Sequence, residues 1–247
     1  CVLSKPGYKL VASGFTEVKK TMVINGVVLM GEEQFMKTQI EEKLAQGFSC
    51  IKLKIGAIDF DKELGLLRFI RQNFDAKTIE IRVDANGAFN SNEALSKLNQ
   101  LNEFELHSIE QPLRANQIQE MKLLCQQTPF PIALDEELIG VFGIENKRIL
   151  LEEIQPQYII LKPSLVGGFK GTLEWIAIAE SLNIGWWITS ALESNIGLNA
   201  ITQFTYTLQN PLPQGLGTGG LYTNNFDCPL KIKKGRIAYN PNLGWDI

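Results

Sequence analysis

Short apolar runs and amphipathic stretches alternate along the chain from about residue 23 to residue 218. The apolar runs predict strands over 23–30, 50–55, 78–85, 107–112, 131–136, 157–163, 184–190 and 215–218. Between them, apolar residues recur at spacings of three and four, which predicts helices over 33–46, 59–74, 91–102, 116–127, 141–152, 168–182 and 194–208. Helical and extended segments therefore follow one another in strict alternation.

This alternation predicts the fold class. Strands that alternate with helices form a parallel sheet in which each helix is a crossover connection. Eight such strands within about 200 residues favour an α/β fold of the TIM type, a (β/α)7β barrel, over an open doubly wound sheet. The glycine-rich phosphate-binding motifs GxGxxG and GxxxxGK[ST] are absent, and GLGTGGL at 215–221 opens no predicted helix.

The two ends of the chain do not continue the alternation. Residues 1–20 fit no barrel unit, and residues 221–247 are predicted to form a strand, a turn and a terminal loop. Both ends are expected to belong to a part that packs beside the barrel. Because the first residue is Cys1 rather than methionine, we expect the sequence to be a piece of a longer protein.

Composition narrows the range of partners. The 247 residues are 45% hydrophobic and 21% charged with a net charge of −3, which argues against a nucleic-acid surface. No uninterrupted apolar stretch of about 18 residues occurs, so no membrane span is expected. The four cysteines (Cys1, Cys50, Cys125 and Cys228) lack metal-ligand spacing and are predicted to be reduced thiols of a cytoplasmic protein.

Charged residues lie at the carboxyl ends of the predicted strands, which is where barrel enzymes have their catalytic residues. They are, in strand order, Lys52 and Lys54, Asp84, Glu110, Asp135 and Lys162. Each one alone has an ordinary explanation, because acidic residues often begin turns and lysines often reach toward water. Three successive strands that end in a carboxylate, with lysines on the strands at either side, indicate one shared site.

The chemistry of this set predicts a metal centre. Three neighbouring carboxylates repel one another, and a hard divalent cation relieves the repulsion; ligands made only of oxygen favour Mg²⁺ or Mn²⁺. Lys52 and Lys54 share one face of their strand, and a lysine beside another cation has a lowered pKa. Lys54 is therefore predicted to be a general base. Lys52 is expected to help tune Lys54 and to hold the substrate carboxylate, while Lys162 arrives from the opposite wall. The combination suits proton abstraction next to a carboxylate.

At these motifs the sequence resembles the enolase superfamily in its muconate-lactonising branch. The residues that carry the resemblance are the KxK pair, Asp84 in DAN, Glu110 in EQP, Asp135 in DEE and Lys162 in KPS. Within that branch the chain is most similar to the o-succinylbenzoate synthase family. The segments INGVVLMG, SALES (190–194) and GLGTGG support this narrower resemblance.

The resemblance implies roles for individual residues. Asp84, Glu110 and Asp135 would ligate Mg²⁺, or Mn²⁺ in its place, with Asn86 and Glu136 behind these ligands. Lys54 would take the proton next to the substrate carboxylate and return it to the departing hydroxyl, through an enediolate. Lys162 would lie over the conjugated ring of the substrate. The succinyl end would be held by Ser190, Gly217, Thr218 and Gly219.

The same resemblance implies an activity and a division of the chain. The activity is the Mg-dependent syn dehydration of 2-succinyl-6-hydroxy-2,4-cyclohexadiene-1-carboxylate to o-succinylbenzoate in menaquinone biosynthesis, so the expected partner is a small carboxylate. Residues 1–20 would end an α+β capping domain, 21–220 would form the catalytic barrel, and 221–247 would return to the capping domain. The last helix of a full eightfold barrel is missing in this family, which agrees with seven predicted helices.

Other functions stay open at this stage. N-succinylamino acid racemases and dipeptide epimerases of the same superfamily use two facing lysines. The dipeptide epimerases tend to carry Asp-x-Asp at the eighth strand, whereas this chain has Gly-Thr-Gly at 217–219. A barrel that only binds a metal and a small acid is a third alternative. His107, the single histidine, and the pair Trp186 and Trp187 are interpreted as structural. The sequence leaves open whether the protein is a homo-oligomer.

Overall fold

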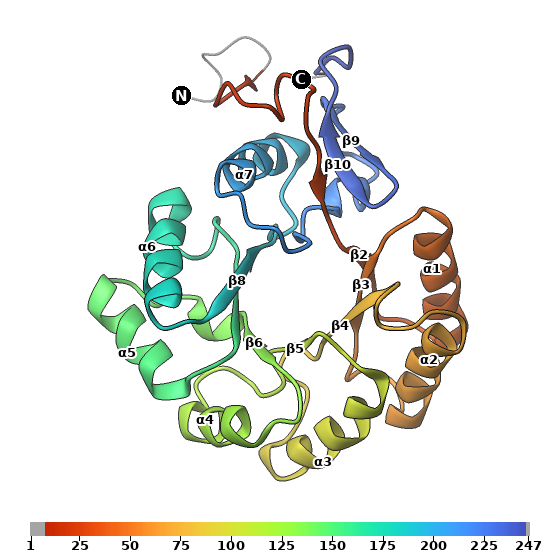
Figure 1. Ribbon diagram of the computed structural model, residues 1–247, viewed down its shortest axis with the longest axis vertical. Helices are drawn as coiled ribbons and strands as arrows, with labels where there is room; N and C mark the ends of the chain where they lie inside the picture. Colours follow the sequence, from red (N-terminus) through yellow and green to blue (C-terminus); the bar gives the residue numbers. More distant parts are fainter. Residues whose placement is uncertain (1–7, 246–247) are drawn as a thin grey trace.

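The computed structural model describes residues 8–245, and its main feature is a curled parallel sheet of seven strands ringed by helices (Figure 1). The strand order is β2-β3-β4-β5-β6-β7-β8, so each strand pairs with its neighbours in sequence. The strands are β2 (Gly26–Val28), β3 (Cys50–Lys54), β4 (Glu80–Asp84), β5 (Ser108–Glu110), β6 (Ile132–Leu134), β7 (Tyr158–Leu161) and β8 (Gly185–Ile188). The predicted α/β class with a parallel sheet is confirmed.

Seven helices connect and follow these strands, as the sequence predicts. They are α1 (Glu33–Ala45), α2 (Phe60–Asn73), α3 (Ser91–Leu101), α4 (Ile118–Gln127), α5 (Ile144–Ile154), α6 (Gly168–Ser181) and α7 (Asn195–Thr207). Each agrees with its predicted range to within a few residues. Helix α3 begins at Ser91, the predicted start, and a capping box joins Asn90, the residue before it, to Glu93.

The prediction of an eighth strand over 215–218 is mostly wrong. Only Gln214 and Gly215 make strand-like contacts, as isolated parallel bridges to Ile24 and Thr189. Because Ile24 lies just before β2 and Thr189 just after β8, these two bridges link the edges of the curled sheet. Residues 218–220 instead form a short 3-10 turn. A glycine-rich segment has little side-chain surface with which to hold a regular strand.

The first predicted strand, 23–30, is divided between two sheets. Its beginning, β1 (Met22–Val23), pairs antiparallel with β10 (Arg236–Tyr239), which pairs in turn with β9 (Leu230–Lys233). Figure 1 shows this small sheet beside the ring of strands, next to α7. Segments from the two ends of the chain therefore lie together outside the parallel sheet.

Two findings bear on the bulk properties predicted from sequence. Among the residues that the structure describes, no helix has both the length and the apolar character needed to cross a membrane. Cys50, Cys125 and Cys228 are free thiols, and Cys50 and Cys125 are buried. Cys1 lies outside the described residues.

The packing around α6 yields a stability prediction. A Cβ atom added at Gly171 would lie 2.1 Å from the carbonyl oxygen of Val166, a backbone atom that cannot move away cheaply. We expect Gly171→Ala to lower the free energy of unfolding by about 1–3 kcal/mol, the usual cost of overpacking. Gly65 in α2 has no atom within 4 Å of its added Cβ, so Gly65→Ala is the matched control and should stabilise by about 0.5–1 kcal/mol. Urea unfolding of both variants checks this, and equal midpoints would contradict it.

Candidate active site

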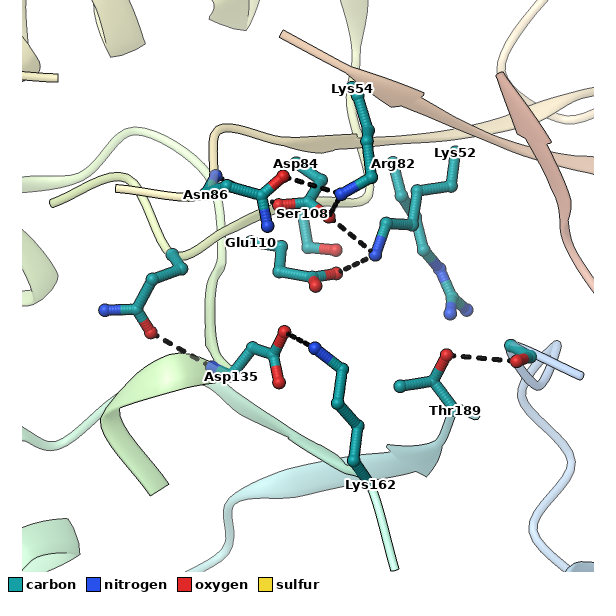
Figure 2. Close-up of polar contacts among 12 residues, drawn as sticks. Lys52, Lys54, Arg82, Asp84, Asn86, Ser108, Glu110, Asp135, Lys162 and Thr189 are labelled. Carbon is teal, nitrogen blue, oxygen red and sulfur yellow. Dashed lines mark hydrogen bonds and ion pairs between the residues drawn. The ribbon is translucent and has the colours of Figure 1, made fainter. Parts of the chain in front are cut away.

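The six charged residues predicted to share a site do converge at the carboxyl end of the parallel sheet (Figure 2). In the register of the sheet, Lys54 pairs with Asp84 and Asp84 pairs with Glu110, so these three residues lie at one level on adjacent strands. Asp135 follows β6 and Lys162 follows β7. Figure 2 shows Lys52 and Lys54 on one side of the carboxylates and Lys162 on the other.

Lys52 bridges two of the carboxylates. Its Nζ lies 2.8 Å from Asp84 Oδ2 and 2.5 Å from Glu110 Oε2, and the side chain is 12% exposed. Burial alone would lower the pKa of Lys52, but the charges of Glu110 and Asp84 outweigh burial and raise this pKa. Lys52 is therefore a fixed positive charge beneath the mouth of the site.

The pKa values of Asp84 and Glu110 are shifted in opposite directions within the same cluster. Burial favours the neutral form of Asp84, but Lys52 and Lys54 outweigh burial and hold its pKa well below the ordinary range. Within residues 8–245, Lys52 is the only side chain that contacts the Glu110 carboxylate. Burial and the neighbouring Asp84 and Asp135 raise the pKa of Glu110 well above the usual value. Its Oε1 atom is buried without a hydrogen-bond partner. The cluster thus has an oxygen that lacks a cation or donor.

Lys54 is the most accessible of the three lysines. Its side chain is 27% exposed, against 12% for Lys52 and 19% for Lys162. Its Nζ lies 3.0 Å from Asp84 Oδ2 and donates to Asn86 Oδ1 at 2.6 Å. The amide of Asn86 donates in turn to Glu136 Oε1 at 2.9 Å. Asn86 is exposed and joins Lys54 to Glu136, so it orients the Lys54 amine. The placement of Asn86 and Glu136 behind the metal ligands remains a prediction.

Lys162 forms an ion pair with Asp135 across the mouth from Lys54. Burial alone would lower the pKa of Lys162, but Asp135 outweighs burial and raises it. Asp135 is 1% exposed, so its charge is almost completely withdrawn from water. The two walls therefore each present a lysine, and the carboxylates lie between them.

The carboxylates fit a divalent cation by their chemistry, although each of them pairs with a lysine in the structure. In the part of the chain that is described, no three acidic, histidine or cysteine side chains are arranged as a ready-made metal cluster. The donors are nonetheless all carboxylate oxygens, and Glu110 Oε1 and Glu136 Oε2 are buried without partners. The assignment of Asp84, Glu110 and Asp135 as ligands remains a prediction.

The residues predicted to hold the succinyl end lie partly together. The hydroxyl groups of Ser190 and Thr218 are 2.5 Å apart and both side chains are buried. Gly219 lies against α7, where a Cβ atom would meet Asn195 Oδ1 at 2.4 Å, and its carbonyl accepts from Asn225. Gly217 lies beside the backbone of Asn25. Contact of these four residues with a substrate remains a prediction.

Sequence reasoning missed two buried polar residues near the cluster. Arg82 precedes Asp84 by two positions on β4; it contacts Glu80 at 2.7 Å and its guanidinium lies 4.1 Å from the ring centroid of Trp187. Gln111, directly after Glu110, is completely buried. The period of two along a strand places Arg82 on the same face as Asp84, so the pattern could have revealed it. His107 packs on Tyr158, which fits the structural role predicted for it.

Comparisons with known proteins agree with this geometry. The chain is 56% identical over 227 residues to an o-succinylbenzoate synthase of Desulfotalea psychrophila, covering 92% of this chain and 61% of that protein. The crystal structure of MenC from the same organism superposes with a TM-score of 0.86 at 54% identity, covering 92% of this chain and 63% of that one. An N-succinylamino acid racemase of Thermus thermophilus is 34% identical over 158 residues, which are 64% of this chain and 40% of the racemase.

The chain thus spans about three fifths of the length of the Desulfotalea protein and two fifths of that of the racemase. A family model described as "Enolase C-terminal domain-like" matches residues 36–247, which include all six charged residues of the site. The family and the muconate-lactonising branch that the motifs indicate are confirmed. The chain belongs to the enolase C-terminal domain-like family of the enolase superfamily.

Proposed function

We propose that the complete protein is an o-succinylbenzoate synthase, a lyase of menaquinone biosynthesis. The reaction is the syn dehydration of 2-succinyl-6-hydroxy-2,4-cyclohexadiene-1-carboxylate, in which a proton and a hydroxyl group leave as water and an aromatic ring forms. The observation that carries the proposal is the 56% identity to the Desulfotalea synthase. The lysines on the two sides of the carboxylate cluster also support the proposal, because the reaction needs a base next to the carboxylates that would hold the cation.

Lys54 is the proposed base. Its amine is the most exposed of the three lysines and is oriented by Asn86 Oδ1, so a substrate at the mouth can reach it. Lys54 takes the proton next to the substrate carboxylate and then gives it to the departing hydroxyl, so one residue serves both steps on one face. Lys162, on the opposite wall, places its positive charge against the conjugated ring. Ser190 and Thr218, with Gly217 and Gly219, are proposed to bind the succinyl end.

Asp84, Glu110 and Asp135 would hold Mg²⁺ or Mn²⁺. The bound cation would supply Lewis-acid stabilisation of the negative charge that develops on the substrate carboxylate. The oxygen-only donor set and the unpartnered Glu110 Oε1 support this assignment. Lys52, which contacts both Asp84 and Glu110, would fix the positions of these two carboxylates and add positive charge near the substrate.

We infer the architecture that goes with this function. Residues 21–220 form a (β/α)7β barrel in which Gln214 and Gly215 take the place of the eighth strand, as their bridges on both sides indicate. Residues 1–20 and 221–247 belong to an α+β capping domain of the complete protein. The pairing of β9 with β10 outside the parallel sheet supports the separation of residues 221–247 from the barrel, although Met22 and Val23 of β1, just inside the proposed barrel boundary, join the same small sheet. The free, buried thiols are consistent with a cytoplasmic location.

N-succinylamino acid racemisation is the second candidate activity. Two lysines on facing walls are what a two-base racemase needs, and the Thermus racemase is 34% identical in the region that it shares with this chain. A dipeptide epimerase is less favoured, because residues 217–219 are Gly-Thr-Gly and offer no carboxylate for a free amino group. Exchange of the α-proton of an N-succinylamino acid with solvent deuterium would reveal the racemase.

The experiment that tests the proposed function uses the complete protein with Mg²⁺. We expect rapid loss of the ultraviolet absorbance of the cyclohexadiene substrate, and we expect EDTA to abolish it because the carboxylates then lack their cation. Fast loss that EDTA does not affect would contradict the metal assignment. Loss at the uncatalysed rate would contradict the synthase, and α-proton exchange would then decide for the racemase.

A further inference from the structure

Gln111 is a buried residue that contacts the loops after β4, β5 and β6, next to the three proposed metal ligands. It follows Glu110 directly and is 0% exposed. Its φ of 39° lies in the left-handed region, which residues other than glycine rarely adopt. Its backbone N–H donates to Ala133 O on β6 at 2.9 Å. Its carbonyl oxygen accepts from the Gly87 N–H, in the loop after Asp84, at 2.7 Å.

The side chain of Gln111 reaches the loop after β6. Its Oε1 accepts from the backbone N–H of Asp135 at 3.1 Å and from that of Glu137 at 3.3 Å. Its Nε2 donates to Leu113 O at 3.0 Å and to Glu137 Oε2 at 3.2 Å. These contacts fix which way the amide points, since only the oxygen can accept from two N–H groups.

Glu137 completes the arrangement from the other side. It is 5% exposed, and its Oε1 accepts from the backbone N–H of Asn116, in the loop after β5, at 2.8 Å. A buried carboxylate is costly unless its oxygens are hydrogen-bonded, and here both oxygens are. Gln111 and Glu137 therefore tie the loops after β5 and β6 to each other in both directions.

We propose that Gln111 and Glu137 are positioning residues that set Glu110 and Asp135 for metal binding; this rests on the metal site of the proposed function. The reason lies in connectivity. Gln111 is one residue from Glu110, accepts from the backbone N–H of Asp135, and contacts through Gly87 the loop that follows Asp84. Loss of its amide would leave two buried N–H groups without an acceptor and would let Asp135 move relative to Glu110.

The test measures Mn²⁺ affinity by electron paramagnetic resonance on the complete protein, together with thermal unfolding in EDTA. Gln111→Met keeps the length of the side chain but removes the amide, and we expect Mn²⁺ to bind about 10–100-fold more weakly, as when residues behind metal ligands are lost. Glu137→Gln should also weaken binding, because its NH2 group then faces another donor. The double variant Gln111→Glu with Glu137→Gln restores an amide–carboxylate pair, and we expect it to recover part of the affinity.

Gln157→Met is the matched control. Gln111 contacts the loop that follows β6, whereas Gln157 contacts the opposite end of the same strand. Gln157 Oε1 accepts from the Ile132 N–H at the start of β6, three residues before Asp135 and at the opposite end of the strand from it. We expect this variant to lower the unfolding temperature in EDTA while leaving Mn²⁺ affinity within about twofold of wild type. A Gln111→Met protein that keeps wild-type Mn²⁺ affinity, or a control that loses as much affinity as Gln111→Met, would overturn the proposal.

The outcome is separable from that of the proposed function. If the wild-type protein binds Mn²⁺ tightly but does not dehydrate the cyclohexadiene substrate, the synthase is wrong, and the affinities of the variants still decide the positioning role. If the wild-type protein is an active synthase and Gln111→Met binds Mn²⁺ normally, only the positioning role is wrong.

Discussion

Replacing Lys54 with alanine is expected to lower kcat of the complete protein by about 10³-fold or more, with Mg²⁺ still bound. The side chain contributes the proposed base, and general acid–base catalysis by one residue is commonly worth about 10²–10⁴-fold. Here one amine serves both proton transfers, so the loss should fall at the upper end of that range. The measurement is kcat with the cyclohexadiene substrate, alongside Mg²⁺ affinity by calorimetry.

The controls separate loss of the base from loss of charge or fold. Lys62→Ala removes an exposed lysine of α2 and should leave kcat unchanged. Lys54→Arg keeps a positive charge near Asp84, but a guanidinium does not give up a proton in a protein, so we expect it to be as inactive as the alanine variant. A Lys54→Ala protein with near-wild-type kcat would show that the base is another residue, and Lys162 would be the next to test.

The position of the site could be predicted from sequence because it depends on local periodicities. Strands with a period of two place Lys52 and Lys54 on one face, and strict alternation with helices makes all strands parallel. Parallel strands share one carboxyl edge, so residues that end successive strands must meet there. The convergence of Asp84, Glu110 and Asp135 follows from those two rules.

The pairings within the site could not be predicted, because they depend on side-chain reach across the sheet. Nothing in the sequence indicates that Lys52 contacts both Asp84 and Glu110, whereas Lys162 contacts Asp135. The prediction that Lys52 helps to tune Lys54 and holds the substrate carboxylate therefore did not include its contacts with Asp84 and Glu110. Gln111 escaped notice for a similar reason: its partners Asp135 and Glu137 lie more than twenty residues away.

The edges of the sheet also escaped prediction, since they depend on contacts between distant parts of the chain. The run 23–30 reads VINGVVLM, with apolar residues on both sides of Asn25 and Gly26, so its pattern does not show that Val23, together with Met22 before it, leaves the parallel sheet to pair with β10. Leu216–Thr218 sit among glycines, which adopt many backbone conformations. In both places tertiary contacts, rather than local preference, decide the structure.

Glu110→Gln is expected to abolish tight Mg²⁺ binding without destabilising the metal-free protein. The folded protein raises the pKa of Glu110 because burial and the charges of Asp84 and Asp135 oppose its ionisation. A carboxyl group with a raised folded-state pKa destabilises the fold at higher pH, and this penalty is relieved as the pH falls through that pKa. A neutral glutamine of the same shape removes the penalty, while Lys52 keeps its contact with Asp84 at 2.8 Å.

Thermal unfolding with and without Mg²⁺ tests both halves of this prediction. In EDTA at neutral pH we expect the Glu110→Gln variant to unfold at the same temperature as wild type or higher. Mg²⁺ should raise the unfolding temperature of wild type, because a ligand that binds only the folded state stabilises it, and should have no effect on the variant. Turnover should fall at least about 100-fold, since losing even a residue behind a metal ligand can cost that much. If Mg²⁺ stabilises both proteins equally, Glu110 is not a ligand; if the variant unfolds well below wild type in EDTA, its charge supports the fold rather than the metal.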